Sequence, residues 1–184
     1  YTMEGKLLPK GEIGINHFNI NLEQIKESFE KFIALTHDNG NLIINADNEN
    51  VLDVVIKANS VITKKDLNVY SYSTSNTRCT IYAKDIKLNS NKCYEFDVYY
   101  KNDMICHISL NAPGIHNVSN ALATIAVAIA NDLDIACVKE GLELFTGASR
   151  RFEYKKTIGE NVKVYDDYAH HPTEIMTTLS TAKE

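Results

Sequence analysis

The segment from Ile115 to Ala130 constrains the fold more than any other part of this 184-residue chain. It is so rich in Ala, Ile and Val that hardly any polar face is left for solvent. We therefore predict a helix here that is buried on most sides. Pro113 and Gly114 stand directly before it and end the segment that precedes it. The overall hydrophobic content of 44% is sufficient for a core of this kind.

Two kinds of sequence precede this helix. Residues 21–58 contain helical apolar periodicity on either side of a short apolar run, with Asn21 as a suitable N-cap. Residues 68–110 alternate β-branched and aromatic runs with polar turns, which predicts antiparallel strands. The expected elements are helices over 21–35 and 49–58, and strands over 42–44, 69–72, 79–83, 93–100 and 104–110. The pattern predicts an α/β fold with an antiparallel subregion.

A domain boundary is predicted near Ser149, so that residues 1–148 form one domain and residues 149–184 begin a second. The fixed φ of Pro172 suits the first position of a helix. The elements expected around the boundary are a helix over 137–145 that ends near Gly147, strands over 152–156 and 162–165 around a turn at Gly159, and a helix from Pro172.

Charge and composition exclude several classes of protein. The net charge is −5 and no Lys/Arg run exceeds two residues, which argues against nucleic-acid binding. The longest strongly apolar stretch, 121–130, has about half the length needed to cross a bilayer. The first residues lack the features of a signal peptide, so we expect a cytoplasmic protein without membrane association. The four cysteines, Cys79, Cys93, Cys106 and Cys137, lack zinc-site spacing and are expected to be free thiols.

The first motif, Gly-Ile-His-Asn-Val-Ser-Asn-Ala-Leu-Ala, places polar groups on the first turns of the apolar helix. Asn117 and Asn120 are three residues apart and share one helix face. A carboxamide offers an acceptor beside two donors, which complements the amino group and ring nitrogen of adenine. Alternatively, Asn117 caps the helix and Asn120 bonds a neighbouring loop. The spacing leaves both interpretations open.

The second motif, Gly-Ala-Ser-Arg-Arg-Phe-Glu, lies at the predicted boundary. Either Arg150 or Arg151 could bind a phosphate with two parallel hydrogen bonds across a cleft between domains. The alternative is that the two arginines belong to a solvated surface. The motif alone does not separate the two.

The third motif covers residues 164–175 and holds two carboxylates, two imidazoles and a helix start. It follows an apolar strand, and open α/β sheets bind ligands beyond the carboxyl ends of their strands. A carboxylate of Asp166 or Asp167 can accept two hydrogen bonds from a ribose diol. His170 and His171 precede a helix N-terminus that favours an anion. The alternatives are a carboxylate that braces the loop and a satisfied histidine pair, since a metal site would need further ligands.

These three motifs, in this order and spacing, resemble the Mur ligase family of ATP-dependent amino-acid ligases in peptidoglycan precursor synthesis. The resemblance implies the rear part of a central P-loop-type ATPase domain, followed by the opening of a Rossmann-like C-terminal domain. The implied reaction adds L-alanine to UDP-N-acetylmuramate. The sugar carboxylate attacks the γ-phosphate of ATP and gives an acyl phosphate, which the amine displaces with help from Mg²⁺. Two alternatives stay open: a ligase that recycles a tripeptide onto the same nucleotide sugar, and a non-catalytic nucleotide-binding relative.

The resemblance also implies roles for individual residues. Asn120 would hold adenine, with His116 and Asn117 beside it. Asp167 would bind the ribose hydroxyls, and Arg151 would approach the phosphates or the ribose from the hinge between domains.

Three further residues are expected where the C-terminal domain closes over nucleotide and incoming amino acid. Tyr168 would belong to the nucleotide site, and His170 and His171 would join Arg151 in catalysis.

Two departures from the family pattern matter. The chain has no Gly-x-x-x-x-Gly-Lys-Thr/Ser phosphate loop, which we expect upstream of Tyr1 together with the domain that binds the sugar nucleotide. We therefore expect this chain to be a piece that is inactive alone. The family usually carries Asp-His-Leu-Asp where this chain has Asn16-His17-Phe18-Asn19. His17 is thus a candidate magnesium ligand or a plain loop histidine.

Overall fold

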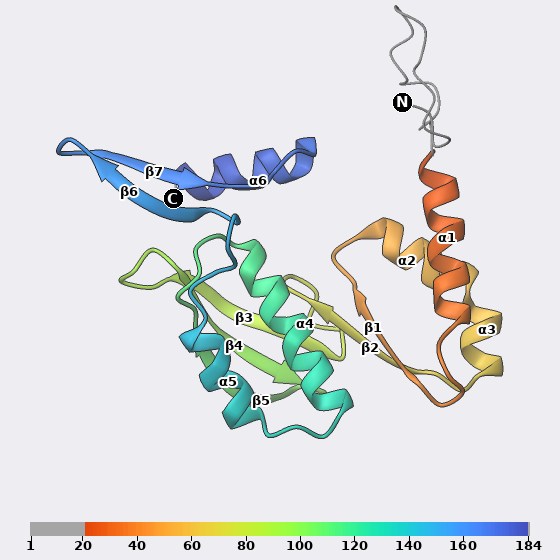
Figure 1. Ribbon diagram of the computed structural model, residues 1–184. Helices are drawn as coiled ribbons and strands as arrows, with labels where there is room; N and C mark the ends of the chain where they lie inside the picture. The colour runs from red at the N-terminus through yellow and green to blue at the C-terminus, as the bar shows by residue number, and fades with distance from the viewer. Residues whose placement is uncertain (1–20, 184) are drawn as a thin grey trace, which may run out of the picture.

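The computed structural model describes residues 21–183, and Figure 1 shows two lobes joined by a linker. We call residues 21–144 the first lobe, 145–152 the linker and 153–183 the second lobe. The elements are α1 (Leu22–Ala34), β1 (Asn41–Asn45), α2 (Glu49–Lys57), α3 (Asn59–Lys64), β2 (Asn68–Ser73), β3 (Ile81–Leu88), β4 (Tyr94–Tyr100), β5 (Asp103–Ser109), α4 (His116–Ala130), α5 (Ile135–Leu144), β6 (Glu153–Ile158), β7 (Val162–Asp166) and α6 (Pro172–Lys183).

The first lobe contains a five-stranded sheet in the order β1-β2-β3-β4-β5. The pairs β3–β4 and β4–β5 are antiparallel, as predicted, but β2 runs parallel to both β1 and β3. The prediction of an antiparallel β2 was therefore wrong. Helices α2 and α3 carry the chain back from β1 to β2, and such a crossover produces a parallel pair. Strand β3 pairs with β2 only through Tyr72 and Ser73, at the end of β2, and then continues beyond it. A short loop is therefore enough to connect these two parallel strands.

Helix α4 lies across this sheet and forms the main core with it (Figure 1). The prediction that it is buried on most sides is confirmed. The helix packs mainly against β1, β2, β3 and β4, while α5 packs against β5. The largest fully buried side chains of this core include Ile81, Phe96, Val98, Ile108, Val118, Leu122 and Ile125. The core therefore fixes the position of the helix that carries the first motif.

Helix α1 begins after the predicted N-cap, but most of its apolar stripe is not buried. Asn21 accepts a hydrogen bond from the backbone N–H of Gln24, and the Gln24 side chain accepts one from the backbone N–H of Asn21, which completes a capping box. The apolar stripe that includes Phe29 and Phe32 is exposed, whereas Ile33 is buried in a small core with α2 and α3. Helix α3 itself was not predicted from the sequence.

The second lobe is the antiparallel hairpin β6–β7 followed by α6, as the strand and helix signals predicted. It lies beside the N-terminal end of α4 in Figure 1. All four cysteines are free thiols. Within residues 21–183, no helix has the length and apolar character needed to span a membrane.

Candidate functional site

A pocket of about 830 Å³ lies between the two lobes. Its walls are the first turns of α4, part of α5, the linker, Asp167 and one face of α6. Five of the residues singled out from the sequence line it: His116, Asn117, Asn120, Arg151 and Asp167. Tyr168, His170 and His171 do not line it. We call it the interlobe pocket, and its volume is in the range of pockets that bind small molecules and cofactors.

A relay of carboxamides sets the orientation of Asn120. The Asn117 Nδ2 donates to the carbonyl of Pro113 at 2.7 Å, so its Oδ1 is left to accept from Asn120 Nδ2 at 3.1 Å. The N-cap of α4 is Ile115, without a side-chain cap, so the alternative that Asn117 caps the helix was wrong. Asn120 is exposed at the pocket and keeps an acceptor and a second N–H for a ligand.

Gly114 allows the two lobes to approach closely beside this relay. Its φ of +96° lies in the region that favours glycine. A Cβ built at this position would lie 2.6 Å from the Thr181 hydroxyl and 2.6 Å from Cε1 of His116. A side chain at position 114 would therefore push α6 or His116 away from the interlobe pocket.

Asp167 braces the loop that it begins. Its carboxylate accepts hydrogen bonds from the backbone N–H groups of Phe152 and Ala169, at 3.0 and 2.8 Å, and from the Thr178 hydroxyl at 2.8 Å. Burial raises the pKa of Asp167, but the hydrogen bonds from Thr178, Ala169 and Phe152 outweigh it and hold the pKa below its usual value. The carboxylate thus ties the linker, the loop and α6 together at the pocket wall.

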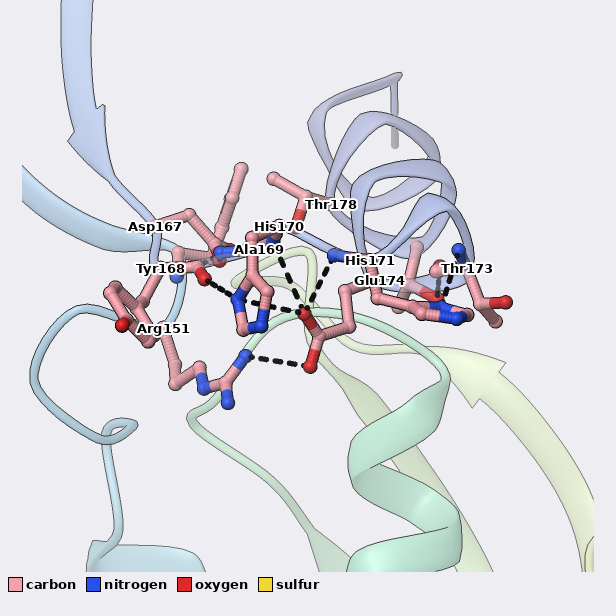
Figure 2. Close-up of polar contacts among 11 residues, drawn as sticks. Arg151, Asp167, Tyr168, Ala169, His170, His171, Thr173, Glu174 and Thr178 are labelled. Atoms are coloured by element: carbon pink, nitrogen blue, oxygen red, sulfur yellow. Dashed lines mark hydrogen bonds and ion pairs between the residues drawn. The ribbon is translucent and has the colours of Figure 1, made fainter. Parts of the chain in front are cut away.

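Glu174 occupies the N-terminus of α6, where the sequence predicted a site for an anion. Its Oε2 accepts from the backbone N–H groups of His170 and His171, both at 3.2 Å, and Figure 2 shows the carboxylate between these groups and Arg151. These hydrogen bonds, His170 first, lower the pKa of Glu174. The N–H groups of His170 and His171 are therefore already taken within the chain, by a carboxylate of α6 itself.

Arg151 reaches into this arrangement from the linker. Its Nη1 lies 3.6 Å from Oε1 of Glu174 (Figure 2), and its side chain is 53% exposed. At this exposure the ion pair contributes little to stability. The guanidinium thus lies beside α6 and keeps donors available at the pocket.

Tyr168, His170 and Arg150 form a separate exposed cluster. The Arg150 guanidinium lies 4.4 Å from the centre of the Tyr168 ring, which meets the His170 ring edge to face. The Nδ1 of His170 is 3.0 Å from the Tyr168 carbonyl. The Nδ1 of His171 accepts from the backbone N–H of Thr173 at 3.3 Å, so this histidine caps α6. In this arrangement these side chains stabilise the loop outside the interlobe pocket.

The sequence interpretation missed Glu174, Thr178 and Thr181, all of which line the pocket. Glu174 carried a usable signal, because it stands three residues after His171, the position of the acidic partner in a capping box. Thr178 and Thr181 carried none, since threonine on an exposed helix is unremarkable.

The proposed metal ligand is not among these residues. His17 lies outside the described residues. Within residues 21–183, no group of three His, Cys, Asp or Glu side chains is placed to hold a metal ion.

Two family models match the chain. Residues 14–128 match the Mur ligase middle domain, and residues 150–184 match the Mur ligase, glutamate ligase domain. The chain belongs to the Mur ligase family. Among curated relatives, the UDP-N-acetylmuramate--L-alanine ligase of Acetivibrio thermocellus is 43% identical over 88% of this chain and 33% of its own length. The chain thus spans about a third of the length of the curated relatives it matches.

Solved structures of Mur ligases have the same fold. The UDP-N-acetylmuramate-alanine ligase of Thermotoga maritima matches with a TM-score of 0.61 and 30% identity, over 84% of this chain and 40% of that chain. The D-alanyl-D-alanyl-adding ligase of Acinetobacter baumannii matches with a TM-score of 0.69 over 86% of this chain and 33% of that one. At 20% identity, the latter supports the fold alone.

Proposed function

We propose that this chain is part of a UDP-N-acetylmuramate--L-alanine ligase that uses ATP and forms an amide bond in peptidoglycan precursor synthesis. The observation that carries the proposal is that Asn120 of the first lobe and Asp167 of the second line one pocket. Relatives that carry this name match most of the chain at about 40% identity, which supports the choice of substrates. The proposed substrates are UDP-N-acetylmuramate and L-alanine, and the proposed location is the cytoplasm.

The pocket has the chemistry to hold adenosine. The Asn120 carboxamide offers the donor and acceptor that adenine needs, while Ala121, Leu142 and Phe145 add apolar surface. Asp167 has three of its lone-pair sites engaged and keeps capacity for one ribose hydroxyl. These residues fit the nucleoside, whereas the phosphate loop of the family is absent from this sequence.

ATP would supply the phosphoryl group that activates the sugar carboxylate for attack by the amine. The residues of this chain act by binding and by charge. The Arg151 guanidinium would place positive charge beside the phosphates, either after its ion pair with Glu174 breaks or while that pair is kept. His170 and His171 would contact the incoming amino acid after movement of the second lobe, because at present they lie outside the pocket.

Magnesium and the domain boundary are further parts of the proposal. Mg²⁺ would be bound by His17 and by groups outside this chain, and no step above depends on it. We place the boundary at Ser149, within the linker, with residues 1–148 in the ATP-binding domain and 149–184 opening the C-terminal domain.

The amine substrate separates this proposal from the tripeptide-recycling ligase. Phosphate release by the full-length protein should require UDP-N-acetylmuramate, ATP and L-alanine, and the tripeptide should not replace L-alanine. A preference for the tripeptide would show that the protein is instead a tripeptide-recycling ligase. The isolated chain should give background activity, and robust turnover by it would contradict its assignment as an incomplete part.

The remaining alternative is a non-catalytic nucleotide-binding relative. The replacement of the expected Asp by Asn16 beside His17 is the observation that favours it. This alternative predicts that the full-length protein binds ATP but releases no phosphate with either L-alanine or the tripeptide. That result would contradict the ligase proposal.

A further inference from the structure

A second pocket, of about 920 Å³, adjoins the interlobe pocket along the linker, and the two share Gly147, Ala148, Arg151 and Phe152 as lining residues. Its walls come from four separate parts of the chain. These are the turn between β3 and β4, Pro113 in the loop before α4, the linker with Phe152, and the β6–β7 hairpin with the end of α6. We call it the linker pocket, and nothing in the proposed ligase reaction uses it.

The linker pocket carries unpaired positive charge. Lys92, Arg151 and Lys163 line it, each from a different segment. Among residues 21–183, neither Lys92 nor Lys163 has an ion-pair partner, and both are exposed. An anion in the pocket would therefore contact two lysines that are not already paired with a carboxylate.

The one acidic residue among those that line the linker pocket is already compensated. Glu153 accepts a hydrogen bond from Lys155 at 2.7 Å, and its other oxygen accepts from the backbone N–H of Arg150 and the Ser149 hydroxyl. The hydrogen bond from Lys155, followed by that from the Arg150 N–H, lowers the pKa of Glu153 to about 2. Its charge is thus balanced locally and does not offset that of Lys92 and Lys163.

One side of the linker pocket is aromatic. The rings of Phe152 and Tyr165 stack with centroids 4.4 Å apart, and Tyr154 meets Tyr165 edge to face. All three line the pocket, together with the carboxamides of Asn91 and Asn161. Aromatic side chains beside cations and carboxamides suit a ligand that joins a planar ring to a phosphate group.

We propose that the linker pocket is a second ligand site, which takes a small nucleoside phosphate through Lys92, Lys163 and the aromatic wall. Arg151 lines this pocket and the interlobe pocket as well. A ligand here that accepts hydrogen bonds from Arg151 competes with the nucleotide of the interlobe pocket for the same donors, and so weakens nucleotide binding there. This coupling rests on the proposed function, whereas the binding itself does not.

Calorimetry on the full-length protein tests the site. The interlobe pocket is kept filled with ADP and the expected sugar-nucleotide site is kept filled with UDP-N-acetylmuramate, and UMP is then titrated in. UMP should bind the wild type and bind about tenfold more weakly to Lys92→Ala/Lys163→Ala, because two charge-assisted contacts are lost. The matched control, Lys31→Ala/Lys64→Ala, removes two exposed lysines outside both pockets and should leave UMP affinity unchanged.

Further arms identify the ligand class and the coupling. Uridine and inorganic phosphate, each with one half of the recognised chemistry, should bind more weakly than UMP. Saturating UMP should weaken ADP binding several-fold in the wild type but not in the Lys92→Ala/Lys163→Ala protein.

Three results would overturn the proposal: no UMP binding, equal UMP affinity in wild type and the double lysine variant, or inorganic phosphate binding as tight as that of UMP. If ADP fails to bind while UMP binding still depends on Lys92 and Lys163, the ligase proposal fails and the second site stands.

Discussion

The two walls of the interlobe pocket are held by different forces. The α4 wall is anchored by apolar packing, with Val118, Leu122 and Ile125 fully buried against the sheet. The facing wall, made of the linker and α6, is held by carboxylates that accept hydrogen bonds from backbone N–H groups. Apolar packing in a dense core has few alternatives, whereas hydrogen bonds at an exposed surface exchange readily with water. The comparison identifies α4 as the fixed reference and the second lobe as the part that can reorient.

The largest expected effect is on the α4 side. Phe96→Ala removes a ring with no exposed surface that packs in the main core with α4. It should destabilise the first lobe by about 3–5 kcal/mol, because the transfer free energy is lost and a cavity remains. Thermal unfolding of the full-length protein measures this, with Ile56→Ala, at 72% exposed, as the control. Equal shifts for both variants would contradict the core described here.

Asp167→Ala tests the opposite wall and should have a smaller effect. Three donors lose their acceptor, but the site is partly exposed and water can replace some of the bonds. We expect a loss of about 1–2 kcal/mol, confined to the linker and second lobe. Hydrogen exchange should increase at Phe152 and Ala169 while α4 stays protected. Increased exchange along α4 would instead indicate that both walls unfold as one unit.

The linker should also respond to acid through Glu153. Its pKa is lowered from 4.5 to about 2, so its contribution to stability is fully present above the unfolded value and is lost as the pH falls from about 4.5 to 2. Proteolysis of the linker by an acid-active protease should be faster in Glu153→Gln than in the wild type at pH 5. The two rates should converge as the pH approaches 2. A constant difference across this range would show that the Glu153 charge does not hold the linker.

The smallest effect concerns the carboxamide relay on the fixed wall. Asn117→Ala should leave thermal stability nearly unchanged and weaken ADP binding a few-fold, because Asn120 loses the acceptor that orients it. Thr124→Ala is a suitable control, since Thr124 lines the same pocket one turn further along α4 but bonds the Asn120 carbonyl. Equal loss of ADP affinity in both variants would argue against a specific orienting role for Asn117.

The sequence pattern predicted most elements of both lobes and the antiparallel pairing of β3, β4 and β5, but not the parallel pairing of β2 or the exposed stripe of α1. The helix over Ile115–Ala130 was identifiable because its burial follows from its own composition. The parallel pairing of β2 was not, because it depends on the crossover through α2 and α3 rather than on β2 itself. The stripe on α1 was correctly periodic, yet Phe29 and Phe32 are exposed.

The pocket shows the same limits. Motif chemistry identified Asn120, Arg151 and Asp167, which come together only through the tertiary fold. The roles of Glu174 as occupant of the helix start and of Asp167 as a brace depend on which donors the fold brings near. The sequence shows which side chains can donate or accept hydrogen bonds, but the tertiary packing determines which of them pair.

The account depends most on two lobes sharing one nucleotide. Calorimetry of ADP binding to the full-length protein, with Asn120→Ala and Asp167→Asn measured singly and together, tests this directly. We predict that each single variant lowers ADP affinity about tenfold or more, consistent with loss of one specific polar contact in each lobe. Unchanged ADP affinity in both single variants would contradict the shared pocket.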